Sequence, residues 1–120
     1  MALTDPSIVL AKEIVRAGKQ LGLKQDEVAN AIGASKSEIN GERTDRITSL
    51  DPVSKQGELA LLVIRIEKSL FSLAGGDESW VKLFMHSQNK MTGGVPAQQI
   101  ASEEGLRKVL LFVDAMQVMA

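Results

Sequence analysis

Residues 58–75 read ELALLVIRIEKSLFSLAG and contain the longest apolar run of the chain, from Leu59 to Ile64. Most of the large side chains recur at helical spacing, which defines one stripe: Leu59, Leu62, Val63, Ile66, Leu70 and Leu73. Leu61, Ile64 and Phe71 lie off that stripe, so the helix is apolar on most of its circumference. Such a helix is buried on most sides. In a chain of 120 residues, it predicts a seam between two lobes or a dimer interface.

Shorter helices are expected on both sides of this stretch. Asp5 and Pro6 begin a helix that runs to about Leu21, where Gly22 ends it. Its apolar side is expected at Ile8, Ala11, Val15 and Ala17 or Gly18. Asp51-Pro52 is expected to begin the next segment in the same way, and the change of composition over residues 44–57 marks a domain boundary.

The helices after the apolar stretch also begin at capping residues. Gly75-Gly76 closes the long helix, and Asp77 caps a helix to about Ser87 on which Trp80, Leu83 and Phe84 share a face. Pro96 fits the first turn of a short helix to Ala101, and Ser102 caps the last helix. The face of that last helix is expected at Leu106, Val109, Leu110 and Val113, widened by Phe112, Met116 and Met119. The pattern predicts an all-α protein with an N-terminal lobe, residues 1–50, and a C-terminal lobe, residues 51–120.

Composition excludes several classes of function. With 14 basic and 15 acidic residues, the chain makes no electrostatic case for nucleic acid or a membrane surface. It has no cysteine, and no run long enough to span a bilayer. The single histidine, His86, has no Cys or paired carboxylate at ligand spacing, so no metal, cofactor or enzymatic activity is expected. We expect a cytoplasmic protein without a membrane segment, and Trp80 in its core.

Residues 24–43, KQDEVANAIGASKSEINGER, predict two short helices joined by a turn at Gly33. The first runs from Gln25 to Ile32, and the second begins at Lys36 after a capping box, Ser35 to Glu38. The stretch resembles the repressor-like helix-turn-helix of the Xre type. On that resemblance, the base-contacting candidates are Lys36, Ser37 and Asn40, and the phosphate-contacting candidates are Gln25, Arg43 and Arg46.

Other features of this lobe favour a plain packing unit instead of a DNA-binding one. Gly41 falls inside the second helix, and Glu42 stands where the pattern expects an apolar residue. Residues 1–50 hold as many acidic as basic side chains, whereas a protein that binds phosphate strongly is normally basic.

Residues 89–105, NKMTGGVPAQQIASEEG, concentrate Gly93, Gly94 and Pro96 between two helices. The glycines permit backbone angles closed to other residues, and proline fixes the helix entry, which predicts a stiff corner. The order of residues over about 57–118 resembles the antitoxin Xre/MbcA/ParS toxin-binding domain family. The positions that carry this resemblance are Trp80, Asn89, Gly93, Gly94, Pro96, Ile100, Glu104, Gly105 and Val109.

The resemblance implies a non-enzymatic antitoxin that covers the active-site cleft of a RES-domain toxin acting on NAD. It also implies a homodimer, and repression of its own operon through operator DNA. Trp80, Asn89, Gly93, Gly94, Pro96 and Gly105 are interpreted as shaping residues. The candidates for toxin contact are Lys90, Met91, Met116, Met119 and Ala120, although a methionine in a helix is more often part of the core. The alternatives are a stand-alone transcriptional regulator and a scaffold or localisation protein of the same family.

Overall fold

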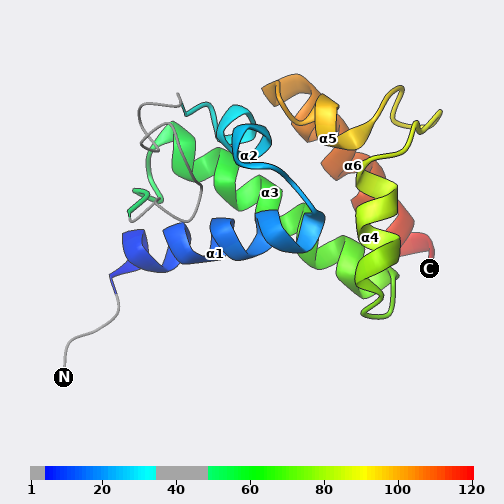
Figure 1. The fold of residues 1–120 in the computed structure, drawn as a ribbon, viewed down its shortest axis with the longest axis horizontal. Helices are drawn as coiled ribbons and strands as arrows, with labels where there is room; N and C mark the ends of the chain where they lie inside the picture. The colour runs from blue at the N-terminus through cyan, green and yellow to red at the C-terminus, as the bar shows by residue number, and fades with distance from the viewer. Residues whose placement is uncertain (1–4, 35–48) are drawn as a thin grey trace.

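The computed structural model describes residues 5–34 and 49–120. In these residues the chain forms six helices and no β-strand, which confirms the all-α prediction. The helices are α1 (Pro6–Leu21), α2 (Gln25–Ile32), α3 (Lys55–Leu73), α4 (Glu78–Met85), α5 (Pro96–Gln99) and α6 (Glu103–Met119). Figure 1 shows α1 and α2 on either side of α3 toward one end of the molecule, and α4, α5 and α6 at the other.

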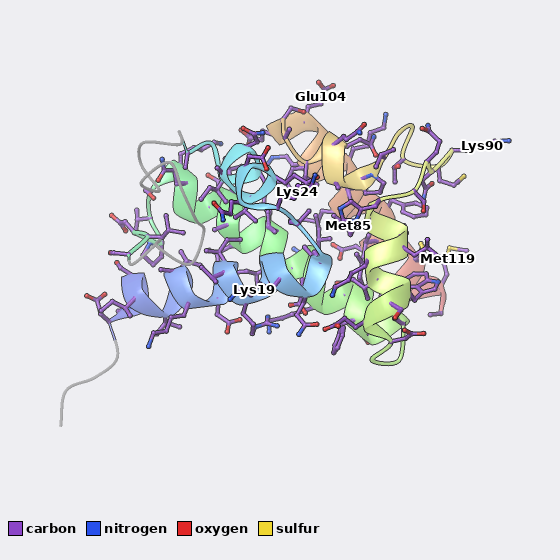
Figure 2. All side chains as sticks on the ribbon, viewed as in Figure 1. Lys19, Lys24, Met85, Lys90, Glu104 and Met119 are labelled. Atoms are coloured by element: carbon purple, nitrogen blue, oxygen red, sulfur yellow. The ribbon has the colours of Figure 1, made fainter. Side chains whose placement is uncertain are left out.

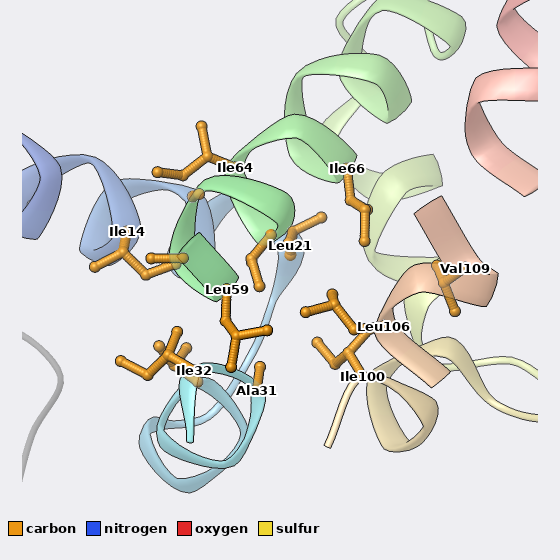
Figure 3. Packing of buried hydrophobic residues seen from close by; sticks show 14 of the residues in the cluster. Ile14, Leu21, Ala31, Ile32, Leu59, Ile64, Ile66, Ile100, Leu106 and Val109 are labelled. Atoms are coloured by element: carbon orange, nitrogen blue, oxygen red, sulfur yellow. The ribbon is translucent and has the colours of Figure 1, made fainter. Parts of the chain in front are cut away.

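Helix α3 is the centre of the fold, as its apolar circumference predicts. It packs against α1, α2, α4 and α6. Val63, Ile66 and Leu70 are fully buried, and only Leu61 among its large aliphatic side chains is half exposed. Figure 3 shows buried side chains from α1, α2, α6 and the segment before α6 gathered around it. A single hydrophobic cluster therefore runs through both predicted lobes.

The ends of the first two helices confirm the reading of their caps. The Asp5 carboxylate accepts the N–H of Ser7 at 2.9 Å. Gly22 and Gly33 end α1 and α2 with φ of 73° and 74°, the left-handed region where glycine carries no steric cost. Lys24 gives α2 no side-chain cap, but Glu27 reaches back and accepts the Lys24 N–H at 2.7 Å. The predicted helix from Lys36 lies outside the described residues.

Two local predictions are wrong, one of them only in part. On the predicted side of α1, Ala11, Ala17 and Gly18 are buried, but Ile8 is 41% exposed. The full buried side of α1 is Leu10, Ala11, Ile14, Ala17, Gly18 and Leu21. This face is fixed by Gly18, where a Cβ would lie 2.8 Å from a methyl group of Val28 on α2. Asp51-Pro52 does not begin a helix, because residues 51–54 form a turn in which Ser54 donates to the Asp51 carbonyl oxygen. Ser54 then caps α3.

Candidate functional site

The loop between α4 and α5 is built around Asn89. The Asn89 N–H donates to the carbonyl oxygen of Gly94 at 2.8 Å, and the Asn89 carbonyl oxygen accepts the N–H groups of Gly93 and Gly94. The Asn89 side-chain oxygen accepts two more N–H groups, from Met91 at 2.8 Å and Thr92 at 3.2 Å. One residue therefore closes a six-residue loop, since asparagine can bond the backbone that follows it.

Residues within the loop and directly after it complete the corner. Gly93 has φ of 87°, which a residue with a side chain adopts only at a cost. Thr92 is fully buried, and its carbonyl oxygen accepts a hydrogen bond from the Gln99 amide on α5 at 2.6 Å. Pro96 stands at the start of α5, as predicted, although α5 ends at Gln99 rather than Ala101. The stiff corner read from the sequence is thus a hydrogen-bonded loop followed by a short helix.

The tip of this loop carries Lys90 and Met91. Met91 is 75% exposed, and Lys90 is exposed as well. Figure 2 shows Lys90 projecting from one end of the molecule, with Met119 near the same end. The structure therefore brings both groups of predicted contact residues, the loop tip and the end of α6, to a common end of the fold.

An aromatic stack joins α4 to α6 next to the loop. Trp80 stacks on Phe84 with ring centroids 5.8 Å apart, and Phe84 stacks on Phe112 of α6 at 6.2 Å. Offset aromatic pairs of this kind contribute beyond the area that they bury. An open pocket of about 200 Å³ lies beside the stack, lined by Trp80, Leu83, Phe84, Ser87, Gln88 and Asn89.

The expectation that Trp80 belongs to the core is wrong. Its side chain is 37% exposed, and Leu83 beside it is 66% exposed, whereas Val81 and Met85 are the buried residues of α4. Helix α4 has only eight residues and is apolar on two faces, of which the core can cover one. Two apolar faces on so short a helix are the sequence signal that one face stays at the surface. In the structure that face is the one with Trp80 and Leu83.

The C-terminal end of α6 carries exposed apolar side chains. Met116 is half-buried, while Val118, Met119 and Ala120 are exposed. Leu111, which the sequence did not single out, is 72% exposed. By contrast, the predicted buried face of α6, Leu106, Val109, Leu110 and Val113, is confirmed.

The first turn of α6 is held to α3 by ion pairs. Glu103 receives hydrogen bonds from Lys55 at 2.9 Å and Arg107 at 2.8 Å, and Arg107 also reaches Glu58 at 2.7 Å. The hydrogen bond from Lys55, followed by that from Arg107, lowers the pKa of the Glu103 carboxyl. The partners of Arg107, Glu103 foremost, raise its pKa. All of these groups lie near the surface, so their role is to orient α6.

Gly105 explains how closely α5 approaches α6. A Cβ at this position would collide with the carbonyl oxygen of Gln99. The Ser102 hydroxyl accepts the Gly105 N–H at 3.0 Å, which is the predicted cap of α6. Gly105 is therefore a packing requirement, in keeping with its interpretation as a shaping residue.

Of the six candidates for DNA contact, the structure describes one. Gln25 is exposed at the first position of α2. Lys36, Ser37, Asn40, Arg43 and Arg46 lie outside the described residues. Val28 and Ile32 on α2 are buried as predicted, whereas Ile39 is not described.

Residues 5–34 and 49–120 contain neither a membrane-spanning helix nor a metal-binding group of side chains. None of the helices there combines the length and apolar character that crossing a membrane requires. The same residues include no group of three or more His, Cys, Asp or Glu side chains arranged to hold a metal ion.

The site just described consists of a hydrogen-bonded loop, an aromatic stack and an exposed apolar helix end. Residues 69–117 match the sequence model of the antitoxin Xre/MbcA/ParS C-terminal toxin-binding domain. The C-terminal part of the chain is therefore similar to this domain, as its sequence indicated. The matched segment begins within α3 and contains the loop, the aromatic stack and nearly all of α6. A comparison with curated proteins gave no match.

Proposed function

We propose that this protein is an antitoxin that neutralises a RES-type toxin by binding over its nucleotide cleft. The observation that carries the proposal is the set of large apolar side chains left uncovered within the matched toxin-binding segment: Trp80, Leu83, Met91 and Leu111. Large apolar side chains left exposed are features of interaction sites, and aromatic and methionine side chains are enriched in them. The RES class of the toxin rests on the resemblance of the whole residue pattern.

The mechanism that fits this surface is steric occlusion. The loop tip at Lys90 and Met91 and the end of α6 project from a rigid frame, so little ordering is needed when they contact a partner. Such a protein needs no chemistry of its own. We therefore propose that it acts without catalysis, in the cytoplasm where its toxin acts.

The test begins with co-purification. The chain would be tagged at the N-terminus, so that α6 stays free, expressed from its own locus, and its partner identified. A stoichiometric RES-domain protein is the expected result, and purified antitoxin should suppress its consumption of NAD. NAD consumption that persists at a several-fold excess of antitoxin would rule out neutralisation of that toxin.

A charge in the aromatic pocket should disrupt the complex. Leu83→Asp is expected to weaken binding by about 2 kcal/mol or more, roughly 30-fold, because it places a carboxylate at a central apolar contact. Folding should change little, since Leu83 is 66% exposed. The matched control is Val53→Asp, at a 91% exposed position outside the toxin-binding segment. Equal affinities of the two variants would place the toxin on another surface.

A second proposed role is repression of the protein's own operon as a homodimer. Gln25 is exposed at the start of α2, and Val28 and Ile32 of α2 are buried, as the predicted helix-turn-helix requires. We expect binding to DNA from upstream of the gene that weakens steeply with salt, and weakens further in Arg43→Ala and Arg46→Ala. Fluorescence anisotropy over a range of salt concentrations, with light scattering for the dimer, would measure both. Salt-independent or absent binding would leave antitoxin activity as the sole role.

A further inference from the structure

The loop that presents Lys90 and Met91 is closed within itself, and one side chain ties it to the helices. Backbone groups of residues 89–94 are hydrogen-bonded to one another through Asn89, Thr92 and Gly94. From outside the loop, Gln99 of α5 reaches in and donates its amide N–H to the Thr92 carbonyl oxygen at 2.6 Å. A loop that is rigid internally still needs an external contact to fix its direction.

The packing around Gln99 makes this contact specific. A Cβ on Gly94 would lie 3.2 Å from two side-chain atoms of Gln99, so the glutamine fills the space beneath the loop. Thr92 is fully buried at the same place. The Gln99 side chain thus supports the loop by contact as well as by its hydrogen bond.

The other half of the Gln99 amide shows that the residue is costly to stability. Its side-chain oxygen is buried and accepts no hydrogen bond from the residues that the structure describes. A buried acceptor left unpaired costs about 1–3 kcal/mol. An apolar side chain of similar shape would fill the space without that cost, so filling space does not by itself explain a glutamine at this position. What an apolar residue lacks is the N–H that holds Thr92.

We propose that Gln99 is a positioning residue: it fixes the direction of the 89–94 loop and thereby the affinity for the toxin. Only the effect on toxin binding rests on the proposed function; the effect on the direction of the loop does not. Gln99 acts through Thr92, and the contact itself is made by the loop tip. Without the Gln99 hydrogen bond, the loop keeps its internal bonds but samples several directions, of which one fits the partner. A binding-competent fraction below one weakens the apparent affinity in proportion.

The test uses Gln99→Met, with Gln98→Met as its control. Methionine matches glutamine in length and flexibility but donates no hydrogen bond. The exposed neighbour Gln98 precedes Gln99 on α5. In the full chain, backbone NMR order parameters at Lys90 to Thr92 should fall in Gln99→Met from about 0.85 toward about 0.6, but not in Gln98→Met. The melting temperature should stay near that of the wild type, because the substitution removes one unpaired acceptor, the Gln99 side-chain oxygen, and leaves another, the Thr92 carbonyl oxygen.

The second measurement is the apparent Kd for the RES-domain protein obtained by co-purification. Gln99→Met should raise this Kd between about twofold and tenfold, the range that one net hydrogen bond corresponds to, and Gln98→Met should leave it unchanged. Unchanged order parameters in Gln99→Met would overturn the positioning role. A loosened loop with an unchanged Kd would overturn the link to binding. If the wild type captures no toxin, the proposed function fails, while the NMR result still decides whether Gln99 positions the loop.

Discussion

Two Gly-Gly pairs turn this chain, and the structure uses them in different ways. At Gly75 and Gly76, between α3 and α4, both φ angles are positive, and a Cβ on either residue would meet nothing within 4 Å. At the second pair only Gly93 has a positive φ, while Gly94 packs against Gln99. The first pair reverses the chain in open space. The second lies inside a hydrogen-bonded loop, where the lack of a side chain permits close packing.

The largest loss of stability is expected where a glycine permits close packing, and a smaller one where a glycine only turns the chain. Gly105→Ala, in the closely packed region, would force a Cβ into the Gln99 carbonyl oxygen. Overpacking against backbone should cost about 3 kcal/mol in the free energy of unfolding. Gly76→Ala is the control and should cost about 1 kcal/mol, because only its φ of 86° is strained. Denaturant titrations would measure both, and similar losses would mean that α5 can shift away from α6 at little cost.

Removing the centre of the loop should have the next largest effect. Asn89→Ala removes the oxygen that accepts the Met91 and Thr92 N–H groups. Two lost hydrogen bonds predict a decrease of about 2 kcal/mol in the free energy of unfolding. Asn89→Asp keeps an oxygen acceptor and should lose less than half as much. Thermal unfolding, with hydrogen exchange at Met91 and Thr92, would test this, and equal losses would assign Asn89 a role other than accepting these bonds.

A matched pair of glycines sharpens the comparison between the two corners. Gly76 and Gly93 have φ of 86° and 87°, and neither has a close contact at the position of a Cβ. Substitution by alanine should therefore cost each about 1 kcal/mol of stability. Only Gly93→Ala should weaken binding to the co-purified toxin, by about tenfold, because only it distorts the presented loop. Equal loss of toxin binding in both variants would show that the loop conformation is not what the partner recognises.

Local signals predict the helix ends, because caps and glycine stops act within a few residues. The ends of α1 and α2, the Asp77 and Ser102 caps, and the buried face of α6 all follow from such signals. The predicted face of α1 is right at Ala11, Ala17 and Gly18 and wrong at Ile8, because which turn of a helix is covered depends on the elements that pack on it. The Asp51-Pro52 prediction is wrong because the turn folds back onto Gly57, where a Cβ would collide with the Asp51 carbonyl oxygen.

The candidate site was predictable in outline and not in detail. The Gly-Gly-Pro segment predicts a corner. The hydrogen bond from Gln99 to Thr92 could not be predicted, because it depends on the direction of a helix of only four residues. An exposed Trp80 was missed because an isolated tryptophan is more often interior than not. Whether Trp80 is covered depends on what packs on α4, and Phe112 of α6 stacks on Phe84, its neighbour on that helix.

The smallest effect should come from the charges that hold α6 to α3. After the first Gly-Gly pair, the ion pair Lys82–Glu78 lies within one helix, α4. After the second pair, Glu103 joins α6 to Lys55 of α3. Because the pKa of Glu103 is lowered in the folded state, its contribution is present above the unfolded value of about 4.3 and is lost as the pH falls through the folded value. Glu103→Gln should therefore lower stability slightly at pH 7 and flatten its decline on acidification.

The control for this last variant is Glu104→Gln, at the neighbouring exposed position. It removes the same charge from the same helix end, where acidic residues also favour the helix dipole. Unfolding curves between about pH 7 and pH 3 should differ more from the wild type in Glu103→Gln than in Glu104→Gln. Added salt should narrow that difference, because exposed pairs are screened. Identical curves for the two variants would mean that the dipole, rather than the contact with α3, accounts for the acid dependence of α6.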